Sequence, residues 1–438
     1  MSYVVRWTRT RRRAPALREQ AAFYSQPRTS AAIREWQLGR LNQIWQEAYV
    51  SSPHYAELKR VHALPERFSS LEEYALRMPI LDRPALQRED ARFGSIRRAA
   101  DFSRITGGST AEPVQIASWR SELRYSDLDY GLAREWFGVK PADRLFLLWG
   151  HAHLFGAGWR GTLNRWQRRL KDALLGYHRF SAYDLSPAAM QRAVAALNRF
   201  RPDAVIGYST ALEAMAESML EAGVPLQPYK LKVVIATAEA FRLPDSARRI
   251  SEAFGCRVAM EYGAVETGVI AHEHPKGGFR VFWRHHLLEG IPSTELPDTY
   301  ELLITNLFPR CTPLLRYRLG DLVSENPSDP AFDQVFSRVI GRCNDHVQLA
   351  DGRRIHSELF AHVLRQYPEF QQFQVVQRAD GAVALHVVAP LQDGEALFGR
   401  LRENLARVHP ELARIECRLV DSLPKTIAGK TRRVRREL

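Results

Sequence analysis

Short apolar runs and longer amphipathic stretches alternate through the middle of the chain. Ser186 followed by Pro187 predicts a helix start, because serine caps a helix N-terminus and proline fits its first position. Apolar strands are predicted at residues 204–206, 231–236 and 257–260, with helices at 210–222 and 244–254 between them. This alternation indicates an α/β protein built on a parallel, helix-covered sheet.

The N-terminal region has a different pattern. Residues 1–30 mix arginine, serine and proline and are predicted to form a loosely held arm. Residues 31–50 are predicted as an amphipathic packing helix, because apolar residues recur on one helical face. These residues are Ile33, Trp36, Leu41, Ile44, Trp45 and Ala48.

The pattern of predicted helices and strands changes again near Gly341. Helices are predicted at residues 357–366 and 395–407, and strands at 373–377, 384–388 and 416–420. They form a compact α+β unit, so residues 340–345 are the expected linker. We therefore expect a large N-terminal domain over residues 1–340 and a small C-terminal domain over residues 341–438.

Composition limits the class of protein. The 438 residues are 45% hydrophobic and 25% charged, and the four cysteines have no C-x-x-C spacing. These features favour a globular protein of the reducing cytoplasm over a disulfide framework or a zinc finger. We find no apolar run of roughly 18 residues for a membrane span and no apolar segment of a secretory signal.

The net charge of +13 has two interpretations. It is compatible with binding to nucleic acid or to an acidic membrane. It is also compatible with an arginine-rich surface, denser at both tails, that attracts anionic ligands in general. Since no nucleic-acid-binding motif accompanies the charge, we expect no nucleic acid partner.

The stretch from 258 to 268 reads V-A-M-E-Y-G-A-V-E-T-G. It predicts a buried strand that runs into a polar, glycine-containing turn. In an open α/β sheet, ligands bind just outside the carboxyl ends of the strands. Tyr262 can stack there on a planar base, and Glu266 can hold a divalent metal on phosphate oxygens. A purely structural turn is the alternative.

Two further loops follow predicted strands. Residues 106–111 are small or hydroxyl residues, whose backbone N–H groups and side chains suit phosphate oxygens, although a plain surface turn has the same composition. The strand at 145–149 leads into the glycine-flanked loop 150–158. His151, His153 and Phe155 in this loop predict a pocket wall for a flat ligand. A His-x-His metal site is the alternative, but no third ligand is near in the sequence.

Two more motifs complete an ordered set. Asp321, in R-Y-R-L-G-D, can accept hydrogen bonds from both hydroxyl groups of a ribose. Gly341-Arg342 then leads to the lysine-bearing loop P-K-T-I-A-G-K, which ends at Lys430. A lysine on a separate small domain can swing in to neutralise a reacting phosphate. The four signals together predict a nucleotide site.

This ordered set resembles the adenylate-forming superfamily of acyl-CoA synthetases, peptide-synthetase adenylation domains and luciferases. The similarity is greatest to the phenylacetate–CoA ligase branch, including its capsule-locus relatives. It covers nearly the whole chain, from the helix near residue 31 through P-H-Y-A-E-L at 53–58 to the C-terminus. The resemblance implies a large adenylation domain and a small mobile domain.

The resemblance also implies roles for individual residues. Glu266 resembles the magnesium-coordinating glutamate, Lys430 the lysine required for adenylation, and Asn344 falls at the hinge. The residues matched to nucleotide binding are Thr106, Gly107, Gly108, Ser109, Thr110, Ala238, Glu239, Tyr262, Gly263, Asp321 and Arg342. The residues expected to line the acid pocket are Trp149, His151, His153, Phe155 and Tyr208.

Four features depart from the family pattern. Ala111-Glu112 stands where the phosphate loop usually has Gly-Lys, and Leu319 replaces a usual threonine. Asp351-Gly352 is a shifted version of the glycine loop of the CoA-dependent half-site. The cysteine cluster of some relatives is replaced by His272 and His274, which we interpret as loop residues. These departures make CoA a less secure assignment than adenylation.

The expected activity is ATP- and Mg²⁺-dependent activation of a carboxylic acid, preferably an aryl acid, followed by transfer to CoA. The alternative acceptors are a carrier protein, an amine or a reductase. A non-catalytic binding protein of the same fold is a second alternative, since fold does not fix the reaction. The oligomeric state is open, with a homodimer as one option.

Overall fold

The computed structural model describes most of the chain. Residues outside the description are 1, 89, 106–113, 150–157, 183–184, 222–229, 239, 242–244, 295, 343–345, 352–353, 365, 368, 391–393, 407–408, 425–430 and 438. Within the described residues, no helix is both long enough and apolar enough to cross a membrane.

The first part of the chain is helical. Its helices are α1 (Ser2–Ser25), α2 (Ser30–Ser51), α3 (Pro53–Val61), α4 (Leu71–Arg77), α5 (Arg83–Arg88) and α6 (Asp90–Phe93). The prediction of a packing helix at 31–50 is confirmed by α2, whose start is capped by the Thr29 hydroxyl. Trp45 on its inner face is fully buried in the largest core cluster.

The prediction of a loose N-terminal arm is wrong, because α1 is a packed helix. Leu17 is 4% exposed, and the buried Gln20 amide donates a 2.7 Å hydrogen bond to the Asp129 carboxylate. Near the start of α1, the Arg6 guanidinium donates to the backbone oxygen of Ala142. Apolar packing at Leu17 and polar anchors at Arg6 and Gln20 together hold α1 in place, and a pattern of apolar residues alone does not reveal the polar anchors.

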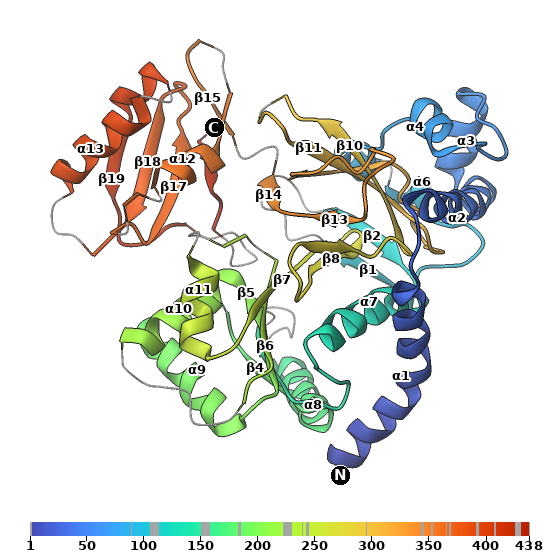
Figure 1. The fold of residues 1–438 in the computed structure, drawn as a ribbon, viewed down its shortest axis with the longest axis horizontal. Helices are drawn as coiled ribbons and strands as arrows, with labels where there is room; N and C mark the ends of the chain where they lie inside the picture. The colour runs from blue at the N-terminus through green and yellow to red at the C-terminus, as the bar shows by residue number, and fades with distance from the viewer. Residues whose placement is uncertain are drawn as a thin grey trace.

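The central sheet has eight strands in the order β13-β9-β8-β7-β6-β5-β3-β4 (Figure 1). Strands β4, β3, β5, β6 and β7 are parallel, which confirms the predicted parallel sheet, while β8, β9 and β13 add antiparallel pairs. Their bounds are β3 Leu145–Leu148, β4 Tyr177–Phe180, β5 Ala204–Tyr208, β6 Val233–Thr237, β7 Val258–Ala264, β8 Gly268–Glu273, β9 Phe279–Val281 and β13 Val335–Phe336.

Helices lie on both sides of this sheet. On one side are α9 (Pro187–Phe200), α10 (Ser209–Glu221) and α11 (Ser246–Phe254), and on the other are α7 (Leu123–Trp136) and α8 (Gly158–Leu175) (Figure 1). The Ser186 hydroxyl accepts from the Ala189 N–H and Pro187 is the first residue of α9, as predicted. A short 3₁₀ helix, η1 (Arg120–Glu122), precedes α7.

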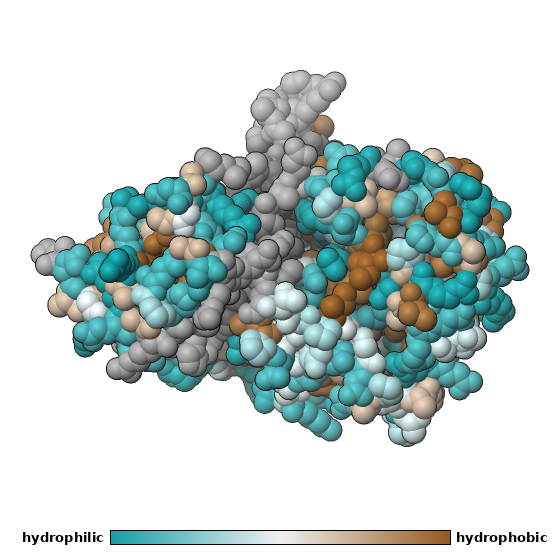
Figure 2. Space-filling view, turned by 90° about the horizontal axis from the view of Figure 1, so that it is seen from above, coloured by the Kyte–Doolittle hydropathy of each residue, from teal (hydrophilic) through white to brown (hydrophobic). Residues whose placement is uncertain are grey.

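Two smaller sheets complete the part of the chain up to Arg342. Strands β1 (Phe102–Ile105) and β2 (Gln115–Ser118) form an antiparallel pair. Strands β10 (His286–Pro292), β11 (Tyr300–Asn306), β12 (Tyr317–Val323) and β14 (Val339–Arg342) form an antiparallel sheet. Seen from above, the surface is mostly hydrophilic, with hydrophobic patches on the part that holds α2–α4 and β10 (Figure 2).

The C-terminal part has its own hydrophobic cluster. It contains a four-stranded sheet in the order β19-β18-β17-β20, and the predicted helices and strands of this region are confirmed. Its elements are β15 (His346–Gln348), β16 (Arg354–His356), α12 (Ser357–Leu364), β17 (Gln372–Gln377), β18 (Val383–Val388), α13 (Glu395–Ala406), η3 (Pro410–Arg414), β19 (Glu416–Leu419) and β20 (Val434–Arg436). Because β14 still pairs with β12, we propose that the two domains divide after Arg342.

Candidate nucleotide and acid site

Two residues predicted for nucleotide binding are in direct contact. The Tyr262 hydroxyl donates a 2.9 Å hydrogen bond to Oδ2 of Asp321. Tyr262 belongs to strand β7 rather than to the turn after it, which corrects the sequence interpretation. The β7–β8 pairing shifts register between Tyr262 and Gly263. A Cβ on Gly263 would lie 2.4 Å from the Gly268 carbonyl oxygen, so only glycine fits this close approach.

A third predicted residue, Arg342, lies on strand β14, which pairs with β12. Asp321 in β12 is the register partner of Arg342 in β14. Asp321 is 7% exposed, and its strand is fixed between β11 and β14. The fold thus brings Tyr262, Asp321 and Arg342 together beside the carboxyl end of β7, where the sheet topology predicts a ligand.

Glu266 lies in the turn between β7 and β8 and is 4% exposed. Its Oε1 is 3.3 Å from Nη1 of Arg83, the first residue of α5. Its backbone oxygen accepts a 2.6 Å hydrogen bond from Nη2 of Arg310. The turn is therefore fixed by two arginines, one at the carboxylate and one at the backbone.

The Glu266 carboxylate suits a magnesium ion only if a nucleotide supplies further oxygen ligands. Among the described residues, no group of three or more His, Cys, Asp or Glu side chains could hold a metal by itself. Mg²⁺ commonly takes one or two protein carboxylates and completes its coordination with phosphates and water. A single carboxylate at Glu266 matches that pattern, and it would hold Mg²⁺ on phosphate oxygens.

A buried ionic cluster supports the Glu266 turn. Nε of Arg310 is 3.6 Å from the Glu122 carboxylate, which also lies 3.4 Å from Nη2 of Arg104. Glu122 further accepts a hydrogen bond from the Cys311 N–H. Burial lowers the pKa of Arg310 to about 10, while Glu122 opposes the shift, so the guanidinium remains charged at neutral pH.

This cluster was not predicted from the sequence. Arg104 lies in β1, directly before the predicted phosphate loop, so Glu122 links the base of that loop to Arg310 and thereby to Glu266. The three residues are scattered along the chain and match no motif. Only their contacts with one another mark them, and such contacts become visible once the fold is known.

Of the residues predicted to line the acid pocket, the structure describes Trp149 and Tyr208. Trp149 follows β3 and Tyr208 ends β5, and their ring centroids are 5.0 Å apart at an interplanar angle of 48°. Tyr208 is 8% exposed. Between them, position 207 of β5 requires glycine, because a Cβ there would lie 2.7 Å from Cβ of Leu148. The two rings lie at the carboxyl ends of two neighbouring strands and pack against the core cluster there.

The segment after β6 also reaches this edge of the sheet. Ala238 has a φ of 69°, a left-handed conformation that is uncommon for alanine. Three residues further on, the Phe241 carbonyl accepts a 2.8 Å hydrogen bond from Nη2 of Arg433. The C-terminal part therefore touches the segment that follows Ala238.

Several predicted site residues lie outside the described residues, as does the side chain of Arg342, and the predictions for them stand as made. They are Thr106, Gly107, Gly108, Ser109, Thr110, His151, His153, Phe155, Glu239, Asn344 and Lys430.

The interpretation of His272 as a loop residue is wrong. His272 lies in β8, is fully buried, and its ring contacts the rings of Trp136 and Phe137. Burial lowers its pKa to about 4, so the imidazole is neutral. His274 does follow the strand in a turn, as predicted.

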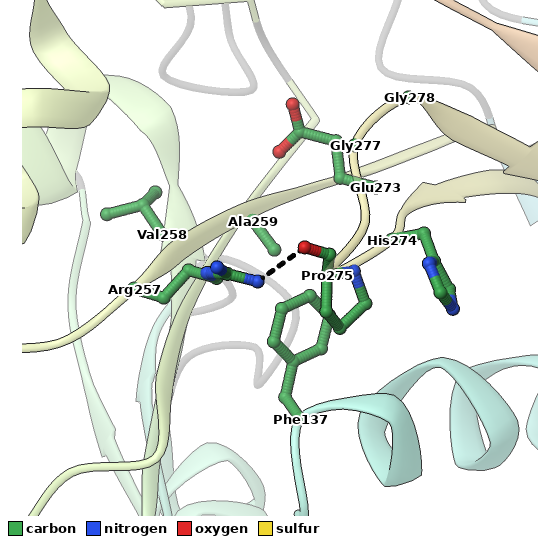
Figure 3. A pocket seen from close by; sticks show the side chains of 9 residues that line it. All are labelled: Phe137, Arg257, Val258, Ala259, Glu273, His274, Pro275, Gly277 and Gly278. Atoms are coloured by element: carbon green, nitrogen blue, oxygen red, sulfur yellow. Dashed lines mark hydrogen bonds between the residues drawn. The ribbon is translucent and has the colours of Figure 1, made fainter.

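A cavity of about 220 Å³ lies at the opposite end of β7 (Figure 3). Arg257, directly before β7, crosses it and donates a 2.7 Å hydrogen bond to the Pro275 carbonyl. Phe137, Glu273 and His274 line it as well. Because it is at the amino end of the strand, this cavity is separate from the Tyr262 site.

Comparison with known proteins supports the sequence interpretation. No protein-family model matches the chain. Protein CapK of Staphylococcus aureus is 25% identical over 261 residues, which is 58% of this chain and 57% of CapK. Phenylacetate-coenzyme A ligase of Thermus thermophilus is 24% identical over 375 residues, covering 80% of this chain and 79% of the ligase. The chain is thus similar in sequence to phenylacetate–CoA ligases, which supports the superfamily expected from its motifs.

Solved structures of two CoA ligases share the fold of this chain. The structure of 2-hydroxyisobutyryl-CoA ligase in the postadenylation state, in complex with 2-HIB-AMP, has a TM-score of 0.68 at 21% identity. The match covers 91% of this chain and 88% of that one. The anthranilate CoA ligase AuaEII, in complex with anthranoyl-AMP, gives a TM-score of 0.53 at 15% identity, covering 76% of this chain and 64% of that one. The fold of 2-hydroxyisobutyryl-CoA ligase thus extends over nearly the whole chain.

Proposed function

We propose that this protein activates a carboxylic acid with ATP as an acyl-adenylate and transfers the acyl group to coenzyme A. The observation that carries the proposal is the contact between Tyr262 and Asp321 beside the carboxyl end of β7, with Arg342 opposite Asp321 on β14. An aromatic ring for a base and a carboxylate for ribose hydroxyls are the two groups that a bound nucleoside needs.

In the first step, a carboxylate oxygen of the acid bonds to the α-phosphorus of ATP as the bond to the pyrophosphate oxygen breaks. This step depends on positioning and electrostatics rather than on a covalent enzyme intermediate. Lys430 is assigned to stabilise charge on the phosphate, and residues 106–110 to hold the phosphates. Mg²⁺ held by Glu266 would neutralise phosphate charge.

In the second step, the thiol sulfur of coenzyme A bonds to the acyl carbon and AMP leaves. We assign Asn344 as the hinge about which the small domain reorients between the two steps. The contact between Arg433 and Phe241 supports close approach of the C-terminal part to the nucleotide edge.

An aryl acid is the preferred substrate class. Trp149 and Tyr208 present flat rings at the carboxyl ends of β3 and β5, and this geometry suits an aromatic ring of the acid. His151 or His153 would meet a polar substituent on it. The named relatives include ligases of phenylacetate, anthranilate and 2-hydroxyisobutyrate, so both aryl and aliphatic acids belong in the test panel.

The test is acid-dependent release of pyrophosphate from ATP, measured with and without coenzyme A. Release that needs an acid and increases with coenzyme A supports the full proposal. Acid-dependent release indifferent to coenzyme A points to a carrier protein, an amine or a reductase as acceptor. Failure to bind ATP at millimolar concentration would make the chain a non-catalytic member of the fold, consistent with Glu112 in the phosphate loop.

A further inference from the structure

Helix α8 exposes its apolar side to solvent. Leu163, Trp166 and Leu170 are 45%, 62% and 47% exposed. They are spaced three and four residues apart, so they form one stripe along the helix. A surface helix ordinarily turns such a stripe toward the protein core, and α8 does the reverse.

Among the described side chains of α8, the buried one is the polar Asp172. Asp172 is 7% exposed, and Oδ2 of Asp172 is 2.8 Å from Nε of Arg179 in β4 and 3.6 Å from Nε of Arg168. No described residue of α8 belongs to a hydrophobic core cluster of the protein. An ion pair therefore fixes the helix, and its apolar stripe is left for an external surface.

The neighbouring helix α1 is strongly basic and packs against α8. By sequence, α1 has six basic residues and one acidic residue, and α8 has five basic and one acidic. Nine of the thirteen net positive charges of the chain therefore lie on these two helices. On α1, Trp7 is 45% exposed with the Arg11 guanidinium over its ring.

This surface is remote from the proposed catalytic site. Figure 1 shows α8 and the N-terminal half of α1 at the bottom of the molecule, with α12, α13 and the rest of the C-terminal part at the opposite end. Movement of the C-terminal part during catalysis would thus leave the stripe uncovered. Arg6 and Gln20 fix α1 to the body of the protein, so the basic charge is held beside the stripe.

We propose that α1 and α8 dock the protein peripherally on an anionic lipid surface. Exposed tryptophan and leucine beside clustered arginine and lysine are the features of helices that lie in the membrane interface. The apolar side chains enter the boundary of headgroups and acyl chains, and the basic side chains contact anionic headgroups. A second copy of the chain fits less well, because two strongly basic faces repel and three side chains supply little of the roughly 800 Å² per partner of a standard interface.

The experiment is flotation of the full-length protein with vesicles of phosphatidylcholine, alone or enriched in phosphatidylglycerol. We expect binding to the anionic vesicles only. Trp166→Ser/Leu170→Ser should weaken it roughly tenfold or more, because both side chains are exposed in the free protein and lose only their membrane burial. The matched control is Leu76→Ser/Ile96→Ser, which removes two exposed apolar side chains elsewhere and should leave binding unchanged.

A second variant tests the charge. Arg169→Gln/Lys171→Gln neutralises two exposed cations of α8 and should reduce binding roughly fivefold per charge. Absence of binding to anionic vesicles, or binding that survives Trp166→Ser/Leu170→Ser, would overturn the proposal. A stable dimer that dissociates with the same substitutions would also overturn it, in favour of a second copy. If the protein bound duplex DNA and vesicles equally, and Trp166→Ser/Leu170→Ser changed neither, the surface would be a non-specific polycation. That result would also overturn the proposal.

Discussion

The hydroxyl group of Tyr262 donates a hydrogen bond of 2.9 Å to Oδ2 of Asp321, which lies 59 positions further along the chain. This bond joins β7 of the eight-stranded sheet to β12 of the antiparallel sheet. It fixes the rotamers of a candidate base-stacking ring and a candidate ribose-binding carboxylate at once. The two sheets are therefore aligned at the point where a nucleoside would bind both.

Tyr262→Phe is expected to raise the KM for ATP roughly fivefold, the effect of losing about 1 kcal/mol of hydrogen bonding. The ring remains for stacking, so kcat should change little. Asp321→Asn should raise the same KM further, because the charged acceptor for ribose hydroxyls is lost. Steady-state kinetics of pyrophosphate release measures both. Tyr49→Phe on the distant helix α2 is the matched control, and an equal effect of Tyr49→Phe would remove the assignment.

Glu122→Gln is expected to destabilise the fold by about 3–5 kcal/mol, because it leaves the buried Arg310 and the half-buried Arg104 guanidinium groups without their carboxylate. The free energy of unfolding in urea measures the loss. Asp127→Asn on nearby α7 removes a carboxylate from an exposed pair with Arg13 and should change stability by less than about 1 kcal/mol. Similar losses in both variants would contradict a special role for the buried cluster.

Stability should fall in acid because of His272. Its pKa is about 4 in the folded protein and about 6.5 in an unfolded chain. Between these values the unfolded chain binds a proton that the folded protein does not. The contribution is thus fully present above about pH 6.5 and lost as the pH falls toward 4, by on the order of 3 kcal/mol.

Urea unfolding at several pH values tests this. His272→Leu removes the titrating group and should flatten the decline between pH 6.5 and 4. His62→Leu, at an exposed position, should keep the steep decline of the natural sequence. An unchanged slope in His272→Leu would assign the acid sensitivity to other groups, such as His286, whose pKa burial lowers to about 3.

The sequence predicted those parts of the fold that apolar periodicity determines. The parallel strands β5 and β6, helix α9 with its Ser186 cap, and the elements of the C-terminal part follow from local pattern and capping. Helix α1 was missed, because polar residues such as Gln20 share its buried side with apolar Leu17 and Tyr24. Periodicity of apolar residues carries no signal for such contacts.

The candidate site was likewise predicted only in part. Tyr262, Asp321 and Arg342 came from ordered motifs, and the structure brings these motifs together. Arg83, Glu122 and Arg310 were not predicted, because a buried ion pair depends on distances between residues far apart in the chain. The outward stripe of α8 was equally hidden, since a helical pattern shows that one face is apolar but not which way that face points.

Lys430→Ala is expected to reduce adenylation by roughly a hundredfold or more, because a cation aimed at a reacting phosphate acts chiefly in the transition state. Binding of the acid should remain. The measurement is exchange of labelled pyrophosphate into ATP, which reports the first step without coenzyme A. Lys425→Ala removes the other lysine of the same loop and is the matched control. If adenylation survives in Lys430→Ala, or falls equally in Lys425→Ala, the loop supplies general positive charge rather than a catalytic lysine, and Lys430 loses its assigned role.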